Sequence, residues 1–253
     1  MLEVRAVPAF QDNLLWLLRC SVTGQTAAVD PGDAGPILEA LGGQPLHQVL
    51  LTHHHPDHIG GVDELRERTG AQVLGFARDR HRLPRLDRAL EEGEAISVGE
   101  EQATVLFLPA HTMGHIAYRF TTTEALFCGD TLFLMGCGRL FEGDPAMLWA
   151  AMERLRALPP ATRIYCAHEY TLTNARFAVE VDPDNEALRE RLARVQALRA
   201  DGRNTVPGTV AEERLTNPFM RADQPELALG LGMPGASPVE VTAALRQRRN
   251  TFR

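Results

Sequence analysis

The fold of this chain is decided by the segment Thr52-His53-His54-His55-Pro56-Asp57-His58-Ile59-Gly60-Gly61. It follows directly on an apolar stretch, Val49–Leu51, that we expect to be a strand. On an extended turn, His53 and His55 project to one side and His54 to the other. The proline bends the chain, so Asp57 and His58 face a second point. Two sets of donors close together predict two metal ions rather than one.

Three more candidate ligands come after apolar stretches that we also expect to be strands. They are His111 after Thr104–Leu108, Asp130 after Leu126–Cys128, and His168 after Ile164–Cys166. Ligands in layered α/β proteins often lie where strands end. Imidazole and carboxylate groups suit zinc, iron and manganese, and no thiolate ligand is needed.

Single histidines have a simpler explanation than metal binding. Taken alone, His111, His115 or His168 is more often a satisfied polar residue at a loop end. His47 and His81 are interpreted as structural. The dense cluster is difficult to explain in this way, because so many titratable side chains rarely crowd together without a function.

Composition excludes several other classes of protein. The chain has 253 residues and a formal net charge of −7, which argues against a nucleic-acid partner. All of its basic residues are arginine, so Schiff-base chemistry and a phosphate-loop lysine are excluded. No apolar run is long enough to cross a membrane and no secretory signal is recognised, so we expect a cytoplasmic protein. Four widely spaced cysteines are expected to be reduced and mostly buried: Cys20, Cys128, Cys137 and Cys166.

The pattern of expected secondary structure changes near Tyr170. Up to Cys166, short apolar strands alternate with helices, but no strand pattern of comparable quality follows. Instead, a helix is expected over Asn185–Ala200. A final helix begins with the capping box Ser237-Pro238-Val239-Glu240. We therefore predict two domains, residues 1–172 and residues 173–253, with the second helical.

The histidine segment with its separate His, Asp and His positions resembles the metallo-β-lactamase superfamily. The resemblance implies an α/β fold, a four-layered αββα sandwich with the metals at one edge, here followed by a small α-helical C-terminal domain. It also implies two divalent ions per chain, zinc first, with iron or manganese as alternatives. The implied ligands are His53, His55 and His111 for one ion, Asp57, His58 and His168 for the other, and Asp130 between them.

Further segments are similar to the glyoxalase II (hydroxyacylglutathione hydrolase) family over almost the full chain. They are Val29–Asp33, Gly129–Phe133, Gly136–Gly143, Ala167–Thr171 and Thr216–Arg221. By this resemblance the helical domain binds a glutathione thioester, and the glutathione contacts are Arg139, Tyr170, Arg246 and Arg249. Ala110 and Ala167 depart from the family, which has glycine at both positions, and this puts the geometry of two ligand loops in question.

The charge of the C-terminal segment favours the same substrate. Residues 241–253 contain four arginines and no acidic residue. Arg246 and Arg249 are three apart and share a helix face, and their guanidinium groups suit the carboxylates of glutathione. Arg248 and Arg253 are interpreted as complements to the helix dipole.

The resemblance implies hydrolysis of S-D-lactoylglutathione and other S-2-hydroxyacylglutathiones to glutathione and D-lactate. A hydroxide bridging the two metals would attack the thioester carbonyl. Asp57 would orient that hydroxide and Asp130 would bridge the ions. His115 and Asp30 are expected to hold ligand histidines in place. We expect a small-molecule substrate, no nucleic-acid or membrane partner, and a monomer.

Four alternatives remain at this point. A persulfide dioxygenase would need one iron, and its relatives lack the long helical tail. A β-lactamase would need a secretory signal, and a nuclease conflicts with the net charge. A metal-binding scaffold without turnover is the alternative from outside enzymology, and a thioesterase assay separates it from an enzyme.

Overall fold

The computed structural model describes residues 1–252, and its internal contacts divide the chain into two units. Unit 1 comprises Met1–Leu108 and Met113–Gly129, and unit 2 comprises Pro109–Thr112 and the chain from Asp130 onward. Within residues 1–252, no helix combines the length and the apolar character that crossing a membrane requires.

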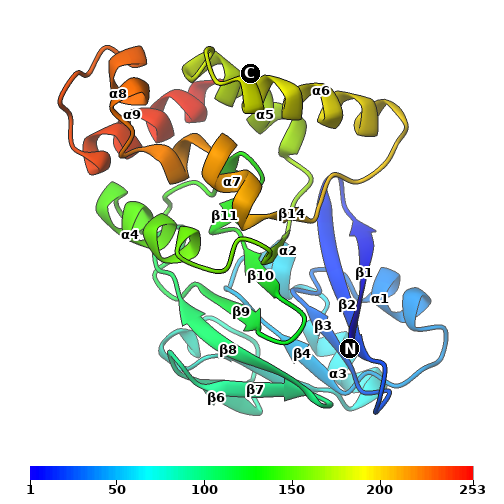
Figure 1. The fold of residues 1–253 in the computed structure, drawn as a ribbon. Helices are drawn as coiled ribbons and strands as arrows, with labels where there is room; N and C mark the ends of the chain where they lie inside the picture. The colour runs from blue at the N-terminus through cyan, green and yellow to red at the C-terminus, as the bar shows by residue number, and fades with distance from the viewer. Residues whose placement is uncertain (253) are drawn as a thin grey trace. The chain divides into compact units, whose positions relative to one another are not determined.

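Unit 1 is built on a mixed six-stranded sheet whose strands follow their order in the chain (Figure 1). β1 to β3 pair antiparallel and β3 to β6 pair parallel. The strands are β1 (Leu2–Ala9), β2 (Asn13–Cys20), β3 (Thr26–Val29), β4 (Gln48–Leu50), β5 (Gln72–Phe76) and β6 (Arg88–Leu90). The parallel strands bring the loops after β3 and β4 to the same edge of the sheet, which is where the histidine segment begins.

Two helices cover one face of this sheet. α1 (Ala34–Leu41) and α3 (Val62–Thr69) turn Ile37, Val62 and Leu65 into an apolar core shared with β1 to β5. Burying side chains of this size stabilises the unit by roughly 1.5–3 kcal/mol each. Gly42 and Gly70 end the two helices in the left-handed conformation that glycine adopts without strain.

A second, antiparallel run of strands in unit 1 has the order β10-β9-β8-β7. They are β7 (Ala95–Val98), β8 (Glu101–Phe107), β9 (Ile116–Phe120) and β10 (Ala125–Gly129). Trp16 of β2 meets Phe127 of β10 edge-on at 6.3 Å, and Phe127 also packs against Phe120. β2 is therefore covered on both faces, by helices on one side and strands on the other.

Unit 2 is mainly helical. Its helices are α4 (Pro145–Arg156), α5 (Thr171–Val181), α6 (Glu186–Ala200), α7 (Val210–Thr216), α8 (Pro225–Gly230) and α9 (Pro238–Thr251), with a 3₁₀ turn, η2, at Pro218–Arg221. The short strands β11 (Leu132–Phe133) and β12 (Gly136–Cys137) form a hairpin, and β13 (Arg163–Cys166) pairs with β14 (Gly208–Thr209).

Most of the predicted elements are confirmed. The strands predicted before His111, Asp130 and His168 are β8, β10 and β13. The helix predicted over Asn185–Ala200 is α6, and Ser237 and Glu240 form the predicted capping box of α9. The chain after Cys166 is mainly helical, as predicted, and the one strand pairing described there joins only two residues, Gly208–Thr209, to β13. A pair this short has no periodicity to detect. All four cysteines are free and buried, as predicted. The predicted role of Arg253 lies outside the described residues.

Candidate metal centre

The histidine segment begins directly after β4 and is held from both sides. The hydroxyl of Tyr118 donates to the carbonyl of Leu51 over 2.8 Å, and the backbone N–H of Ile116 donates to the carbonyl of Thr52 over 2.9 Å. Asp30, at the end of β3, accepts both the N–H and the hydroxyl of Thr52, over 2.7 and 2.6 Å. These contacts fix the start of the ligand loop before any metal is present.

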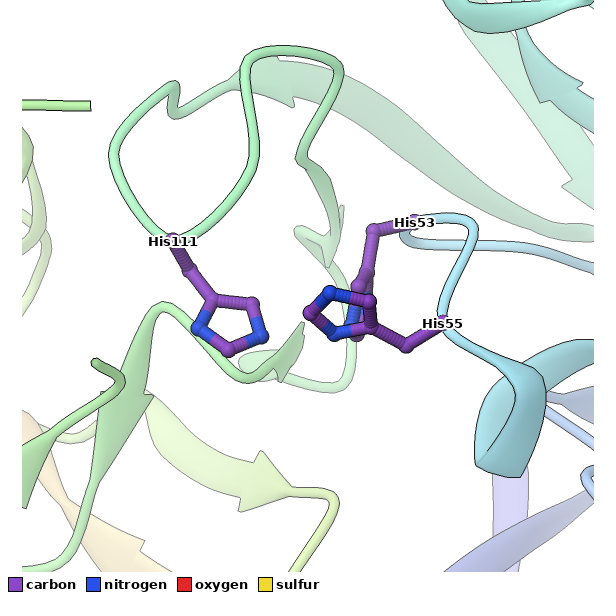
Figure 2. A group of neighbouring side chains, drawn as sticks. All are labelled: His53, His55 and His111. Atoms are coloured by element: carbon purple, nitrogen blue, oxygen red, sulfur yellow. The ribbon is translucent and has the colours of Figure 1, made fainter. Parts of the chain in front are cut away.

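His53 and His55 point the same way from this loop, as the alternation predicted (Figure 2). Nε2 of His53 lies 3.0 Å from Nδ1 of His55. Two nitrogens bound to one tetrahedral zinc ion lie about 3.3 Å apart. The pair is therefore already spaced like two ligands of a single ion. His115 stacks on His53 at 4.7 Å and is completely buried, so it restricts the orientation of that ring.

His54 turns away from its neighbours, also as predicted. Its Nδ1 lies 3.1 Å from Oδ2 of Asp79, whose Oδ1 accepts from Nε of Arg82 over 2.6 Å. Asp79 is buried, and sequence reasoning missed it because it lies in an irregular turn with no recognisable motif.

Asp57 and His58 form the second pair of donors in unit 1. They lie on α2 (Pro56–Ile59), with Oδ2 of Asp57 3.5 Å from Nε2 of His58. The other ring nitrogen of His58 faces Oδ2 of Asp30 at 3.1 Å, which confirms Asp30 as the group that orients His58. A proton shared with this carboxylate stays on Nδ1, which leaves the lone pair on Nε2.

In unit 2, Asp130 faces two histidines with different oxygens. Oδ2 lies 3.4 Å from Nε2 of His111, and Oδ1 lies 3.4 Å from Nε2 of His168. Both separations are longer than a good N–H···O hydrogen bond. They match the roughly 3.3–3.4 Å between a nitrogen and an oxygen bound to one tetrahedral ion. Each oxygen of the carboxylate thus faces the Nε2 atom of a different histidine.

The tautomer of His111 is fixed by its second nitrogen. Nδ1 lies 2.8 Å from the carbonyl oxygen of Arg139, and a carbonyl can only accept, so Nδ1 carries the proton. Nε2 then has the lone pair, on the side of Asp130. Figure 2 shows His111 extending from the loop that follows β8.

Two glycines let the segment after β12 lie close to the His111 loop. A Cβ on Gly138 would come within 2.1 Å of the carbonyl oxygen of Asp130, and one on Gly143 within 2.6 Å of the carbonyl oxygen of Ala110. Ala110 and Ala167, the two departures from the family glycines, are both buried and neither has a positive φ. Alanine is therefore accommodated at both positions without backbone strain.

The four predicted glutathione contacts all lie in unit 2, in different environments. Arg139 is exposed. Tyr170 stacks on His168 at 4.7 Å with the rings 5° from parallel. Arg246 is buried and donates from Nη1 to the carbonyl of Cys137 over 2.7 Å. Arg249 donates to Oδ1 of Asn174 over 3.1 Å.

The three arginines among these predicted contacts interact with one another electrostatically. Partial burial lowers the pKa of Arg249, and the positive charges of Arg246 and Arg139 lower it further. A cluster of guanidinium groups that repel one another is stabilised by an anion. The buried side chain of Arg246 holds the β12 segment, so sequence reasoning that saw only charge missed its structural contacts.

Comparisons with known proteins agree with this geometry. The model of the metallo-beta-lactamase superfamily matches residues 16–168, and the model "Hydroxyacylglutathione hydrolase C-terminus" matches residues 169–252. A hydroxyacylglutathione hydrolase from Methylococcus capsulatus is 53% identical over 100% of both chains. The chain belongs to the hydroxyacylglutathione hydrolase family. A second member, from Rhodospirillum rubrum, is 48% identical over 99% of both chains.

Solved structures show the same fold at greater distance. The B3 metallo-beta-lactamase BLEG-1 has a TM-score of 0.65 and 22% identity, over 87% of this chain and 99% of its own. TTHA1623, solved in a di-iron-bound form, has a TM-score of 0.62 and 27% identity, over 86% of this chain and 99% of its own. The predicted fold, a metallo-β-lactamase sandwich followed by a helical C-terminal domain, is confirmed.

Family membership makes the chain an enzyme of the thiolester hydrolase class. Its histidines and carboxylates fit a divalent metal centre, since the donor atoms are of the right type and, within each unit, spaced as ligands of common ions. The two family models meet between residues 168 and 169. The domain boundary at 172/173 stays a prediction.

Proposed function

We propose that the chain hydrolyses S-D-lactoylglutathione, and other S-2-hydroxyacylglutathiones, to glutathione and the free 2-hydroxy acid. The observation that carries the proposal is the placement of Asp130 between two histidines, one facing each oxygen. Such an arrangement suits two ions. The full-length relatives named hydroxyacylglutathione hydrolases support the substrate.

The proposed ligands divide into two sets with Asp130 shared between them. His53, His55 and His111 would hold one ion, and Asp57, His58 and His168 the other, each set offering three donor atoms. Two bound divalent ions lower the pKa of a water molecule to about 7 and polarise the thioester carbonyl. Zinc is proposed first, with iron or manganese as alternatives, and the di-iron form of TTHA1623 keeps iron in consideration.

The residues of this chain would position the reactants. In the proposal, Asp57 accepts a hydrogen bond from the attacking water and so orients it toward the carbonyl. The leaving group is a thiolate with an ordinary pKa near 8.5, which departs without prior protonation. No separate general acid is therefore required.

Glutathione would be held by the arginine cluster of unit 2. Arg139 and Arg249 are proposed to bind its carboxylates, with Arg246 adding charge from its fixed position and Tyr170 bordering the metal ligand His168. A guanidinium fork binds a carboxylate with two parallel hydrogen bonds. We further propose a cytoplasmic enzyme, because all four cysteines are free, and a monomer.

Hydrolysis of S-D-lactoylglutathione by the purified protein, with bound metal counted on the same sample, tests the proposal. Turnover that a chelator abolishes and that returns with metal supports it. Metal binding without thioester hydrolysis would contradict the substrate and leave the fold in place. Oxygen consumption on glutathione persulfide with a single iron would favour the dioxygenase, which the names of the full-length relatives do not support.

The glutathione site can be tested with neighbouring arginines on α9. Arg249→Met is expected to raise KM about 10- to 100-fold, as expected for losing a hydrogen bond to a charged group, with a smaller effect on kcat. Arg248→Met is the matched control, since Arg248 is exposed and donates to the carbonyl of Leu231. Equal effects of the two variants would contradict a specific role for Arg249.

A further inference from the structure

The hairpin between β1 and β2 brings one polar side chain against the ligand loop. Asn13 is the first residue of β2 and pairs with Ala9 of β1. Its side chain is buried, and Nδ2 lies 3.0 Å from Oδ2 of Asp57 and 3.4 Å from the carbonyl oxygen of Asp57. Both partners can only accept, so the amide nitrogen must be the atom that faces them.

Asp57 is more exposed than two of the other proposed ligands. Its side chain is 42% exposed, whereas those of His58 and Asp130 are 1% and 10% exposed. It lies in the first turn of a four-residue helix. A hydrogen bond from a buried donor favours one rotamer of a partly exposed carboxylate over the others.

The backbone of Asp57 is already held by Gly32. A Cβ at position 32 would come within 1.8 Å of the carbonyl oxygen of Asp57, so only glycine permits this approach. Close packing therefore fixes where the main chain of Asp57 lies. The carboxylate still rotates about its own bonds unless another contact stops it.

We propose that Asn13 is a positioning residue for Asp57. Its amide holds Oδ2 in the rotamer that faces Nε2 of His58, 3.5 Å away, where both atoms would bind the second metal, and leaves Oδ1 for the attacking water. A neutral donor suits this position because it orients the carboxylate without cancelling the charge that binds the cation. The proposal rests on Asp57 being a metal ligand, as in the proposed function.

The competing explanation is that Asn13 only stabilises the hairpin. The two roles differ in what a substitution changes. A structural residue affects the stability of the fold and leaves the properties of the folded molecules unchanged. A positioning residue changes the metal affinity and the kcat of molecules that are fully folded.

Asn13→Leu, which keeps the size of the side chain and removes the donor, is the test variant, with Asn13→Ala as a second in case leucine does not fit. Leu17→Ala is the matched control, because Leu17 is also buried on β2 and belongs to the helix-side core. Metal content is measured after dialysis against buffered free metal, and thermal unfolding is measured on the metal-free proteins. Kinetics with the thioester give kcat and KM separately.

We expect the Asn13 variants to bind one of the two ions about 10- to 100-fold more weakly, the range seen when a group that orients a ligand is removed. In fully loaded protein, kcat should fall while KM stays within about twofold. Leu17→Ala should lower the unfolding temperature and keep both metal affinities. Unchanged metal affinity and kcat in the Asn13 variants would overturn the proposal. The metal readout holds even if the thioester is not the substrate, so failure of the proposed function is distinguishable.

Discussion

At the scale of single residues, Asp130 takes part in more of the proposed chemistry than any other ligand. Each of its oxygens faces a different histidine at 3.4 Å. We expect Asp130→Ala to weaken both metals together and to lower kcat more than about 100-fold, because the ions lose their shared ligand. Metal analysis and thioester kinetics measure these effects. Asp184→Ala, at an exposed position, is the control. If the Asp130→Ala protein still binds one ion tightly, Asp130 is not shared between the two ions.

The cysteines give a second prediction at this scale. Burial raises the pKa of the Cys166 thiol to about 12, whereas a hydrogen bond from Thr23 lowers the pKa of Cys20 to about 7. Both thiols are buried, so alkylation of the native protein should be slow even at pH 8, and Cys20 should react before Cys166 because thiolates react and thiols do not. Peptide mass spectrometry after iodoacetamide treatment of the native protein reports each site. Early modification of Cys166 would contradict this order.

At the scale of elements, the N-terminus of α9 depends on its capping box. Ser237 accepts from the N–H of Glu240, and Glu240 accepts in return from the N–H of Ser237. Ser237→Ala should reduce the free energy of unfolding by about 1 kcal/mol. Urea unfolding measures the loss, with exposed Ser97→Ala on β7 as the control. Equal stability of the two variants would mean that the cap contributes nothing.

Elements with a local signal could be predicted from the sequence, and those without one could not. α9 was predicted from its capping box, and β8 from the apolar stretch that precedes His111. β2, whose sequence Asn13–Cys20 is apolar almost throughout, was not assigned, because a strand buried on both faces loses its alternation. α5 has neither a side-chain cap nor an acidic first turn, so its start at Thr171 gave no signal.

The candidate site divides in the same way. The proposed ligands fall into two groups. His53, His55, Asp57 and His58 could be proposed because they are close together in the chain, and His111, Asp130 and His168 because each follows a strand. Two of their partners, Asp30 and His115, were also proposed from the sequence, but the others could not be found there. Asn13 and Asp79 reach the ligand loop from 44 and 25 residues away, and single polar residues at such separations carry no pattern.

At the scale of the whole molecule, metal binding should contribute to stability. An ion at 100 times its dissociation constant stabilises the folded state by about 2.7 kcal/mol. Chelation should therefore lower Tm by roughly 5–10 °C for each ion lost, given a shift of about 2–4 °C per kcal/mol in a chain of this size. Calorimetry with and without chelator measures the change. In the Asp130→Ala variant, chelation should lower Tm much less. A fall in Tm as large as that of the unsubstituted protein would contradict the proposed ligands.

The shared carboxylate of Asp130 also affects how a population of molecules fills with metal. In the proposed centre, Asp130 would be held in place once one of its oxygens binds a first ion, and its second oxygen would then be in position for the next ion. Binding of the first ion would carry the entropic cost of immobilising that side chain. The second ion would not, so it would bind more tightly than the first. When metal is scarce, the population should then consist mainly of empty and fully loaded molecules, with few in between. The amount of active enzyme would then rise in proportion to the amount of metal supplied, rather than with the square of that amount.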